Sequence, residues 1–249
     1  MNSVKILAMS AILLGGAACA SVETPDFEVD SMTAADGKEL KITFIQHGSL
    51  AINYDGYEIQ IDPVGEYADY SQFPKADVIL ITHGHGDHFD SLAVAAVQKP
   101  ETVIITNADV AEKLCGAQAM NNGDTLVPVP YLDIRAVAAY NTTEGRTQFH
   151  PQGVGNGYVL TLGGTRIYIA GDTENIPEMA ELGEIDIAFL PVNQPYTMTP
   201  EQAVEALRMF KPRIFYPYHY GMTDTPTDIE SLNALLDGSG IELRIRQMQ

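Results

Sequence analysis

The chain has little cysteine and little positive charge. Its 249 residues include 2 cysteines, and 14 Lys and Arg stand against 33 Asp and Glu, which gives a net charge of −19. A chain this acidic repels polyanions and offers no basic stripe for nucleic acid to follow, so we exclude nucleic acid as a partner. The acidity otherwise favours solubility and identifies no substrate.

The chain also lacks an apolar run long enough to span a bilayer. The stretch at residues 6–18 follows Lys5, is too short to cross a membrane and precedes small residues, so we interpret residues 1–20 as an export signal. Two kinds of export signal stay open. Ala-Cys-Ala at 18–20 suits ordinary signal peptidase, whereas Gly-Ala-Ala-Cys at 16–19 resembles a bacterial lipobox, and we favour a lipid on Cys19. We expect a periplasmic protein, or one held at the membrane only by that lipid. Cys115 then has no intrachain disulfide partner, so packing must provide the stability.

Turn residues divide the rest of the chain into two similar halves around a middle loop. Hairpins are expected over residues 27–45, 52–61 and 158–170. Strands over 78–82, 103–106 and 185–190 alternate with helices over 91–98 and from residue 200 onward. Asp90 is the expected N-cap of the first helix, and Thr199 caps the second in a capping box with Gln202. At this length and with 45% hydrophobic residues, we expect one domain.

The segment His-Gly-His-Gly-Asp-His at residues 83–88 directly follows a predicted buried strand. So many imidazoles beside a carboxylate are costly to bring together unless a cation shares their lone pairs. Imidazole and carboxylate suit zinc, iron or manganese. We expect both glycines to take positive φ, so that the loop curls around one point. His83 and His85, two apart on extended backbone, would share one ion, while Asp87 and His88 would turn toward a second.

The other histidines and one aspartate support a metal site. The chain has six histidines, and three lie outside the segment: His47, His150 and His219. Each sits beside a turn or at the end of a predicted strand, where site residues collect on a rigid scaffold. Asp172 lies in the Gly-Asp-Thr turn that ends the strand at 166–170, and there a carboxylate can bridge two metals.

This order of motifs resembles the metallo-β-lactamase superfamily, and within it the UlaG-like metal-dependent hydrolases, which are related to ascorbate-phosphate lactonases. The similarity runs from about residue 40 to the C-terminus and includes Ile-Asp-Pro at 61–63, Leu-Pro-Val at 190–192 and Tyr-His-Tyr-Gly at 218–221. The resemblance implies an α+β fold, a four-layer αββα sandwich with the metals at one edge. Residues 21–39 would be an N-terminal segment with the first hairpin strand, and residues 40–249 the metallo-hydrolase domain.

The resemblance also implies a set of metal ligands. His83, His85 and a third His would hold the first metal. Asp87, His88 and His219 would hold the second, and Asp172 would bridge the two. Many relatives have the third His where this chain has Ala-Tyr-Asn at 139–141. Either His150 reaches in from further along the loop, or Asn141 serves as a weaker oxygen ligand. We place His47 beside the site, as the partner of a ligand or as a packed histidine.

Such a site predicts hydrolysis of a small molecule. Two cations about 3.5 to 4 Å apart turn a water into a metal-bound hydroxide near neutral pH, and one of them polarises the substrate. Asp87 would also be catalytic, orienting the hydroxide and passing a proton to the leaving group. We expect two zinc ions, with manganese or iron as alternatives. A lactone or other small ester is the first choice of substrate, a phosphodiester the second and a β-lactam the third. The candidate substrate-binding residues lie in two loops: Arg146, placed to hold a phosphate, and Asn193 and Tyr196 at the expected site edge.

Two other classes of function stay open. A redox di-iron protein of this fold would prefer a Glu where this chain has His85, because harder oxygen ligands stabilise oxidised iron. A non-catalytic, metal-binding exported lipoprotein would keep the fold and lose ligands, and the third histidine is the position in question. Metal analysis separates the three, since two zinc ions per chain favour the hydrolase. No pattern in the chain predicts an oligomeric state.

Overall fold

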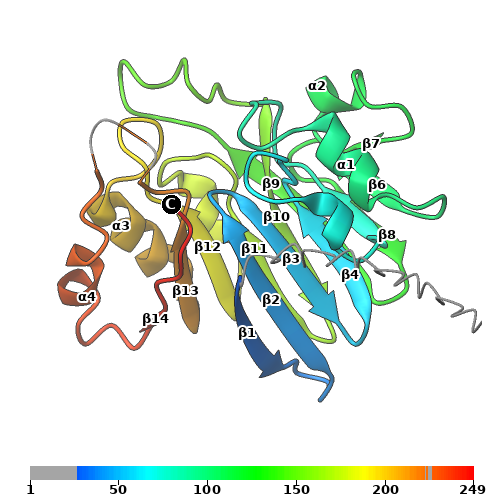
Figure 1. The fold of residues 1–249 in the computed structure, drawn as a ribbon. Coiled ribbons are helices and arrows are strands. Elements are labelled where there is room, and N and C mark those ends of the chain that lie inside the picture. The colour runs from blue at the N-terminus through cyan, green and yellow to red at the C-terminus, as the bar shows by residue number, and fades with distance from the viewer. Residues whose placement is uncertain (1–26, 222, 224–225) are drawn as a thin grey trace, which may run out of the picture.

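Two seven-stranded mixed sheets form the fold (Figure 1). The computed structural model describes residues 27–221, 223 and 226–249. The export signal expected at 1–20, with Cys19, lies outside the described residues, as does most of the N-terminal segment before β1. Cys115 is exposed and free, and no helix in the described part of the chain is long and apolar enough to cross a membrane.

The first sheet has the order β1 (Glu28–Thr33), β2 (Glu39–Gln46), β3 (Ser49–Tyr54), β4 (Tyr57–Ile61), β5 (Val78–Leu80), β6 (Val103–Thr106) and β7 (Gln118–Ala119). The pairs from β1 to β4 are antiparallel, and those from β4 to β7 are parallel. Helix α1 (Ser91–Val97) and the short α2 (Ala108–Ala111) connect the parallel strands, with a 3₁₀ turn at Tyr70–Gln72.

The second sheet repeats this layout in the order β14 (Glu242–Leu243), β13 (Ile214–Tyr218), β12 (Ile187–Pro191), β11 (Thr165–Ile169), β10 (Gly155–Leu162), β9 (Leu132–Ala139) and β8 (Thr125–Val129). The pairs from β8 to β11 are antiparallel, and those from β11 to β14 are parallel. A 3₁₀ turn (Pro177–Glu181) and helices α3 (Pro200–Phe210) and α4 (Ser231–Leu235) complete this half.

The expected hairpins and helix caps are confirmed. The Asp90 side chain accepts a hydrogen bond from the Leu92 amide, and Thr199 and Gln202 form a reciprocal capping box at the start of α3. The middle of the chain is more regular than expected, because β8 and β9 form a hairpin there that extends the second sheet. Leu132, Ile134 and Ala136 point into the core while the residues between them do not, which is the alternation of a half-buried strand.

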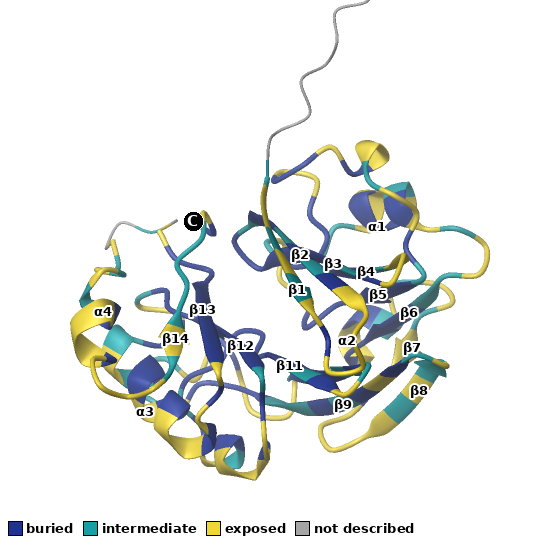
Figure 2. Cartoon of the chain, turned by 90° about the horizontal axis from the view of Figure 1, so that it is seen from below, coloured by how far each residue is buried: buried dark blue, intermediate teal, exposed yellow. Residues whose placement is uncertain are grey.

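Apolar side chains fill three layers between and outside the sheets. Between the sheets, the Phe44 ring lies 5.0 Å from Tyr216, which stacks on Phe189. A second cluster joins the outer face of β10–β13 to α3, and a third joins the outer face of β3–β6 to α1. Figure 2 shows this burial, with α1 outside one sheet and α3 outside the other. This is the α+β, four-layer αββα sandwich that the sequence predicts.

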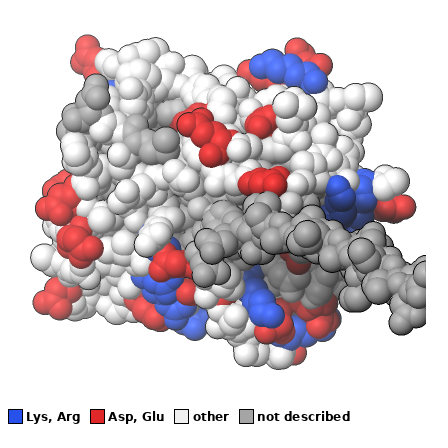
Figure 3. All heavy atoms as spheres, in the orientation of Figure 1, with Lys and Arg blue, Asp and Glu red and all other residues white. Residues whose placement is uncertain are grey.

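Asp30 of β1 ties the first sheet to the C-terminal segment. Its carboxylate accepts hydrogen bonds from Arg244 at 3.0 Å, from Arg246 at 2.8 and 2.9 Å, and from the Tyr216 hydroxyl. On the face shown in Figure 3, Lys and Arg lie beside acidic residues and form no continuous stripe.

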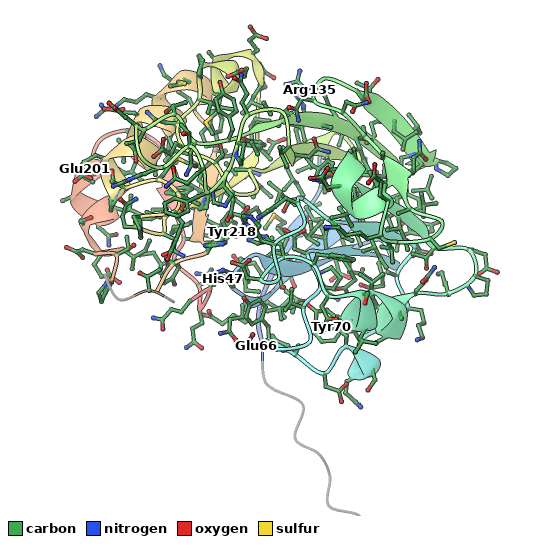
Figure 4. All side chains as sticks on the ribbon, turned by 90° about the horizontal axis from the view of Figure 1, so that it is seen from above. His47, Glu66, Tyr70, Arg135, Glu201 and Tyr218 are labelled. Carbon is green, nitrogen blue, oxygen red and sulfur yellow. The ribbon has the colours of Figure 1, made fainter. Side chains whose placement is uncertain are left out.

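Parallel strands place five polar residues at one edge of the sandwich. In an open sheet, the carboxyl ends of parallel strands meet at the same edge, where ligands bind. One such residue follows each of five strands, at most three positions after its end. After β4, β5, β11, β12 and β13 in that order, they are Asp62, His83, Asp172, Asn193 and His219. The loops between β2 and β3 and between β9 and β10 add His47 and His150 to the same edge, which Figure 4 views from above.

Candidate metal centre

Eight described side chains form two groups of four possible metal ligands. Within each group, one donor atom of each residue lies within 4.8 Å of the others. The groups are His83, His85, His150 and Asp172, and His47, Asp87, His88 and His219. The first contains the set that the resemblance assigns to the first metal together with Asp172, with His150 as the third histidine. The second contains the expected Asp87, His88 and His219, and adds His47.

Asp172 lies between the two groups, and four imidazoles turn Nε2 toward it. Its Oδ2 is 3.0 Å from Nε2 of His150, 3.2 Å from that of His219 and 3.9 Å from that of His83. Its Oδ1 is 3.3 Å from Nε2 of His88. Asp172, the expected bridging carboxylate, therefore contacts imidazoles of both groups.

The opposite nitrogen of each of these imidazoles is anchored. Thr82 Oγ1 contacts Nδ1 of His83 at 3.0 Å, and the backbone carbonyl of Tyr196 lies 3.2 Å from Nδ1 of His150. Asp62 Oδ2 accepts from Nδ1 of His88 at 2.7 Å. Partners of this kind fix a ring's tautomer and direction so that its Nε2 can bind a metal.

Asn193 anchors the fourth ring, with its side-chain amide 3.1 Å from Nδ1 of His219. The atom that faces the ring is the amide nitrogen Nδ2, and Oδ1 has no hydrogen-bond partner among the described residues. Turning the amide over would let Oδ1 accept Nδ1–H and leave the Nε2 lone pair for a cation. The structure thus gives Asn193, a candidate for substrate binding, a contact that orients a ligand. It still lies on the pocket wall.

Several buried polar atoms at this centre have no hydrogen-bond partner among the described residues. They are Nε2 of His88, Nε2 of His219, Oδ1 of Asp172 and Nδ1 of His47. Leaving buried polar groups unpaired is costly. Nε2 of His88, Nε2 of His219 and Oδ1 of Asp172 belong to the contacts around Asp172, and a divalent cation that shares their lone pairs explains these three. Imidazole nitrogen and carboxylate oxygen are the donors that such a cation takes. The residues present therefore fit a metal.

Buried charges set the protonation of the centre. Burial holds the pKa of His83 well below its usual value and lowers that of His47 to about 4, so both rings are neutral at pH 7. Burial alone would raise the pKa of Asp172, but His219 and His88 bring it well below the usual range. The charge of Asp172 in turn outweighs burial and raises the pKa of His88 and His219. A bound cation would take the place of the protons that these two rings attract.

The backbone is constrained around the centre, although not where the sequence predicts. The sequence predicts positive φ at Gly84 and Gly86, and neither residue adopts it. Positive φ falls instead on His47, Asp62 and His219, at 57°, 44° and 51°. Such residues cost free energy and cluster at functional sites. The His83–His88 segment curls through a turn in which the amides of residues 88 and 89 bond the His85 carbonyl, so glycine's special conformation is not needed there.

Two other glycines are required by close packing. A Cβ at Gly48 would lie 2.6 Å from Cε1 of His88, so only glycine lets the β2–β3 turn pass over that ring. Gly171 combines φ of +64° with a site where a Cβ would lie 2.7 Å from the Asn156 carbonyl. Glycine at this point directs the chain from β11 to Asp172.

A pocket of about 450 Å³ opens over the two groups. Eight residues that the sequence places in the site or beside it line the wall: His47, His85, Asp87, His150, Asp172, Asn193, Tyr196 and His219. Four others complete it: Glu66, Tyr67, Gln148 and Phe149. Tyr196 is 40% exposed and packs edge-on against Phe149 at 4.9 Å. A volume of this size suits a small molecule.

The loop that carries His150 is held by buried groups. The Asn141 side-chain amide donates to the backbone carbonyls of Tyr196 at 2.6 Å and of Arg146 at 3.2 Å. Asn141 therefore shapes this part of the pocket, and its Oδ1 has no hydrogen-bond partner among the described residues. The sequence predicts that Arg146 holds a phosphate of the substrate. In the structure its guanidinium lies 3.7 Å from the buried carboxylate of Glu174, and Arg146 is not among the described residues that line the pocket.

Sequence reasoning did not single out Asp62, Glu174, Glu66 or Tyr67. A signal for Asp62 was present, because Ile-Asp-Pro at 61–63 places a carboxylate at the end of a strand next to β5. Glu174 lies two residues after Asp172 and accepts from the amides of residues 142 and 143, a contact that no local pattern predicts. Nothing in the chain's patterning marks Glu66 and Tyr67 as pocket residues.

Comparisons with known proteins identify the family of the chain. The Beta-lactamase superfamily domain matches residues 41–219. A UPF0173 metal-dependent hydrolase of Methanosphaera stadtmanae is 36% identical over 201 residues, covering 73% of this chain and 84% of that protein. A solved structure named as a metal-dependent hydrolase from Parabacteroides distasonis is 57% identical, with a TM-score of 0.86, over 90% of this chain and 100% of that one.

A further solved structure, the metallo hydrolase Igni18 from Ignicoccus hospitalis, is 25% identical with a TM-score of 0.71, over 84% of this chain and 95% of that one. The family match spans most of the chain and includes the His83–His88 segment, Asp172 and His219. The chain therefore belongs to the metallo-β-lactamase superfamily and is a metal-dependent hydrolase of that superfamily.

Proposed function

We propose that this protein hydrolyses a small lactone or other ester with two divalent cations, and that zinc is the metal. The observation that carries the proposal is Asp172, a buried carboxylate toward which four anchored imidazoles turn Nε2 from both groups. Each group combines nitrogen and oxygen donors without a thiolate. This donor set suits zinc, with manganese or iron as alternatives.

Two cations, when bound, supply a nucleophile by lowering the pKa of a water and polarise the carbonyl oxygen under attack. The hydrolysis itself adds water across the acyl C–O bond: hydroxyl goes to the acyl carbon, and a proton goes to the leaving oxygen. The protein must therefore move one proton from water to that oxygen.

Asp87 is placed to move this proton. Its side chain is 42% exposed and lies on the pocket wall. Burial raises its pKa, but His219 and His47 outweigh burial and bring the pKa below the usual range, so Asp87 is ionised at neutral pH. Neutral His47 donates from Nε2 to Asp87 Oδ2 at 3.1 Å and holds the carboxylate toward the pocket. Asp87 then accepts the water's proton and releases it to the leaving oxygen.

A metal-dependent hydrolysis screen tests this function. The protein is stripped with a chelator, reloaded with zinc and assayed by pH-stat on a γ-lactone, an acetate ester and a phosphodiester, the second choice from the sequence. We expect the lactone or ester to be hydrolysed, with activity lost on stripping and restored by zinc. Asp172→Asn should abolish activity and metal loading, whereas Asp133→Asn, which changes an exposed aspartate on β9, should keep both. Full activity in the stripped protein, or no hydrolysis of any substrate by the loaded one, would overturn the proposal.

A further inference from the structure

The pocket wall combines acidic and aromatic side chains without a basic one. Among the described residues that line it, the acidic ones are Glu66 and the two candidate metal ligands Asp87 and Asp172, and the aromatic ones besides histidine are Tyr67, Phe149 and Tyr196. Bound cations would offset the charge of the two ligands, so Glu66 is the acidic side chain of the wall that remains. No Lys or Arg is among the described residues of the wall. A site built to bind an anionic group usually presents Arg or Lys to it, since these side chains form the strong charge-assisted hydrogen bonds.

The cation in the adjoining loop is already neutralised. Arg146 is 3.7 Å from Glu174, whose carboxylate also accepts the amides of residues 142 and 143 at 2.7 and 2.6 Å. Turning Arg146 into the pocket would separate it from this buried carboxylate. The described loop therefore offers no free positive charge to a phosphate or carboxylate of the substrate.

Glu66, unlike Arg146, has no ion-pair partner among the described residues. Its carboxylate is exposed and lies on the pocket wall. It adjoins Tyr67, whose ring lies 5.6 Å from that of His47, and His47 lines the same pocket; Figure 4 labels both Glu66 and His47. An unpaired carboxylate on a pocket wall that also carries aromatic rings is an arrangement that attracts an organic cation.

We propose that the outer part of this pocket recognises a cationic or uncharged group of the substrate through Glu66 and the neighbouring aromatic rings, and disfavours an anionic group there. The inference rests on the proposed function, because it names the substrate class of the same site. Bound metal cations would attract the reacting oxygen of every substrate and would also favour an anionic group close to them, so the discrimination is assigned only to the outer wall around Glu66. The net charge of −19 acts in the same direction over longer distances.

Three small probes with a common hydroxyethyl arm test the inference without requiring turnover. They are choline, its uncharged carbon isostere 3,3-dimethylbutan-1-ol, and the anionic isethionate. Their binding to the zinc-loaded protein is measured by isothermal titration in the wild type, Glu66→Gln and Glu66→Lys. Glu201→Gln is the matched control, because it removes the same charge from the exposed start of α3, and Figure 4 labels Glu201 away from Glu66. Thermal unfolding checks that each variant folds.

We expect wild-type protein to bind choline at least about ten-fold more tightly than isethionate, by the attraction of one nearby carboxylate and aromatic faces. In Glu66→Gln, the choline-to-dimethylbutanol affinity ratio should fall about five-fold. Glu66→Lys should move isethionate ahead of choline, and Glu201→Gln should leave the wild-type ratio unchanged. Raising the ionic strength should shrink the preference, because Glu66 is exposed.

Equal or tighter binding of isethionate in the wild type would overturn the inference. An unchanged ratio in Glu66→Gln, or an equal change in Glu201→Gln, would overturn the role of Glu66. The acetates of the same three alcohols then separate this inference from the proposed function. If the binding order holds but none of the acetates, nor the lactone, is hydrolysed, the proposed hydrolysis is wrong and the charge preference stands. If the three acetates and the lactone are all hydrolysed but choline is not bound more tightly than isethionate, the charge preference is wrong and the proposed hydrolysis stands.

Discussion

Replacing Gly48 with alanine should disable one side of the metal centre without touching a ligand. The new Cβ would lie 2.6 Å from Cε1 and 2.9 Å from Nδ1 of His88. Ordinary contact begins near 3.4 Å, so the ring and the β2–β3 turn must separate by the difference of about 0.8 Å. His88 cannot yield freely, because Asp62 holds its Nδ1 at 2.7 Å and its ring is fully buried.

Two consequences follow from this displacement. Overpacking in a close-packed interior costs about 1–3 kcal/mol of folding free energy. Moving Nε2 of His88 away from Asp172 should lower the affinity for one of the two metal ions about 10- to 100-fold, which is the usual effect of disturbing the contacts that orient a ligand. The other metal, in the group of His83, His85 and His150, should be affected less.

The assay is a chelator competition titration with a metal count, together with thermal unfolding. Gly86→Ala is the matched control, because Gly86 lies inside the His83–His88 segment, has no positive φ and has open space within 4 Å of where a Cβ would lie. The control should bind both metals as the wild type does. If Gly48→Ala also kept both at wild-type affinity, the close approach to His88 would have no part in metal binding.

Two further predictions concern the metal centre, and a third concerns the ion pairs of Asp30. Asp62→Asn should weaken one metal about 10- to 100-fold by loosening His88, and unchanged affinity in a competition titration would contradict this. His150→Ala should weaken one metal only, whereas Asn141→Ala should keep both metals and raise KM, because its amide holds the Tyr196 carbonyl beside the pocket; the reverse ranking would make Asn141 the ligand. Asp30, whose folded pKa lies below the unfolded value near 3.9, stabilises the fold above that value and loses its contribution as the pH falls through the folded pKa. Asp30→Asn should therefore cost about 1–3 kcal/mol at pH 7, with the gap closing below about pH 4 in urea unfolding; a gap that persists at pH 2 would refute the linkage.

Features fixed by short-range contacts could be predicted from the sequence. The capping box at Thr199 and Gln202, the N-cap at Asp90 and the hairpin at Gly163–Gly164 each depend on hydrogen bonds within a few residues. The positions of site residues after strands also followed from the sequence, because strand ends that converge on one edge bring them together.

Contacts between distant segments could not be predicted in this way. His47 reaches Asp87 across 40 residues of sequence, and Arg146 meets Glu174 through a loop whose path depends on the folded second sheet. The prediction for Gly84 and Gly86 is wrong, because residue type alone permits positive φ without requiring it. The strain falls on His47 and His219, where the chain must bend to bring rings from both halves together.

Asp172 should lie between two metal ions. Anomalous diffraction at the zinc edge from crystals of the zinc-loaded protein tests it most directly. Two peaks are predicted, one among His83, His85 and His150 and one among Asp87, His88 and His219, each within bonding distance of Asp172. A single peak, or two peaks of which one does not contact Asp172, would contradict a bridging Asp172.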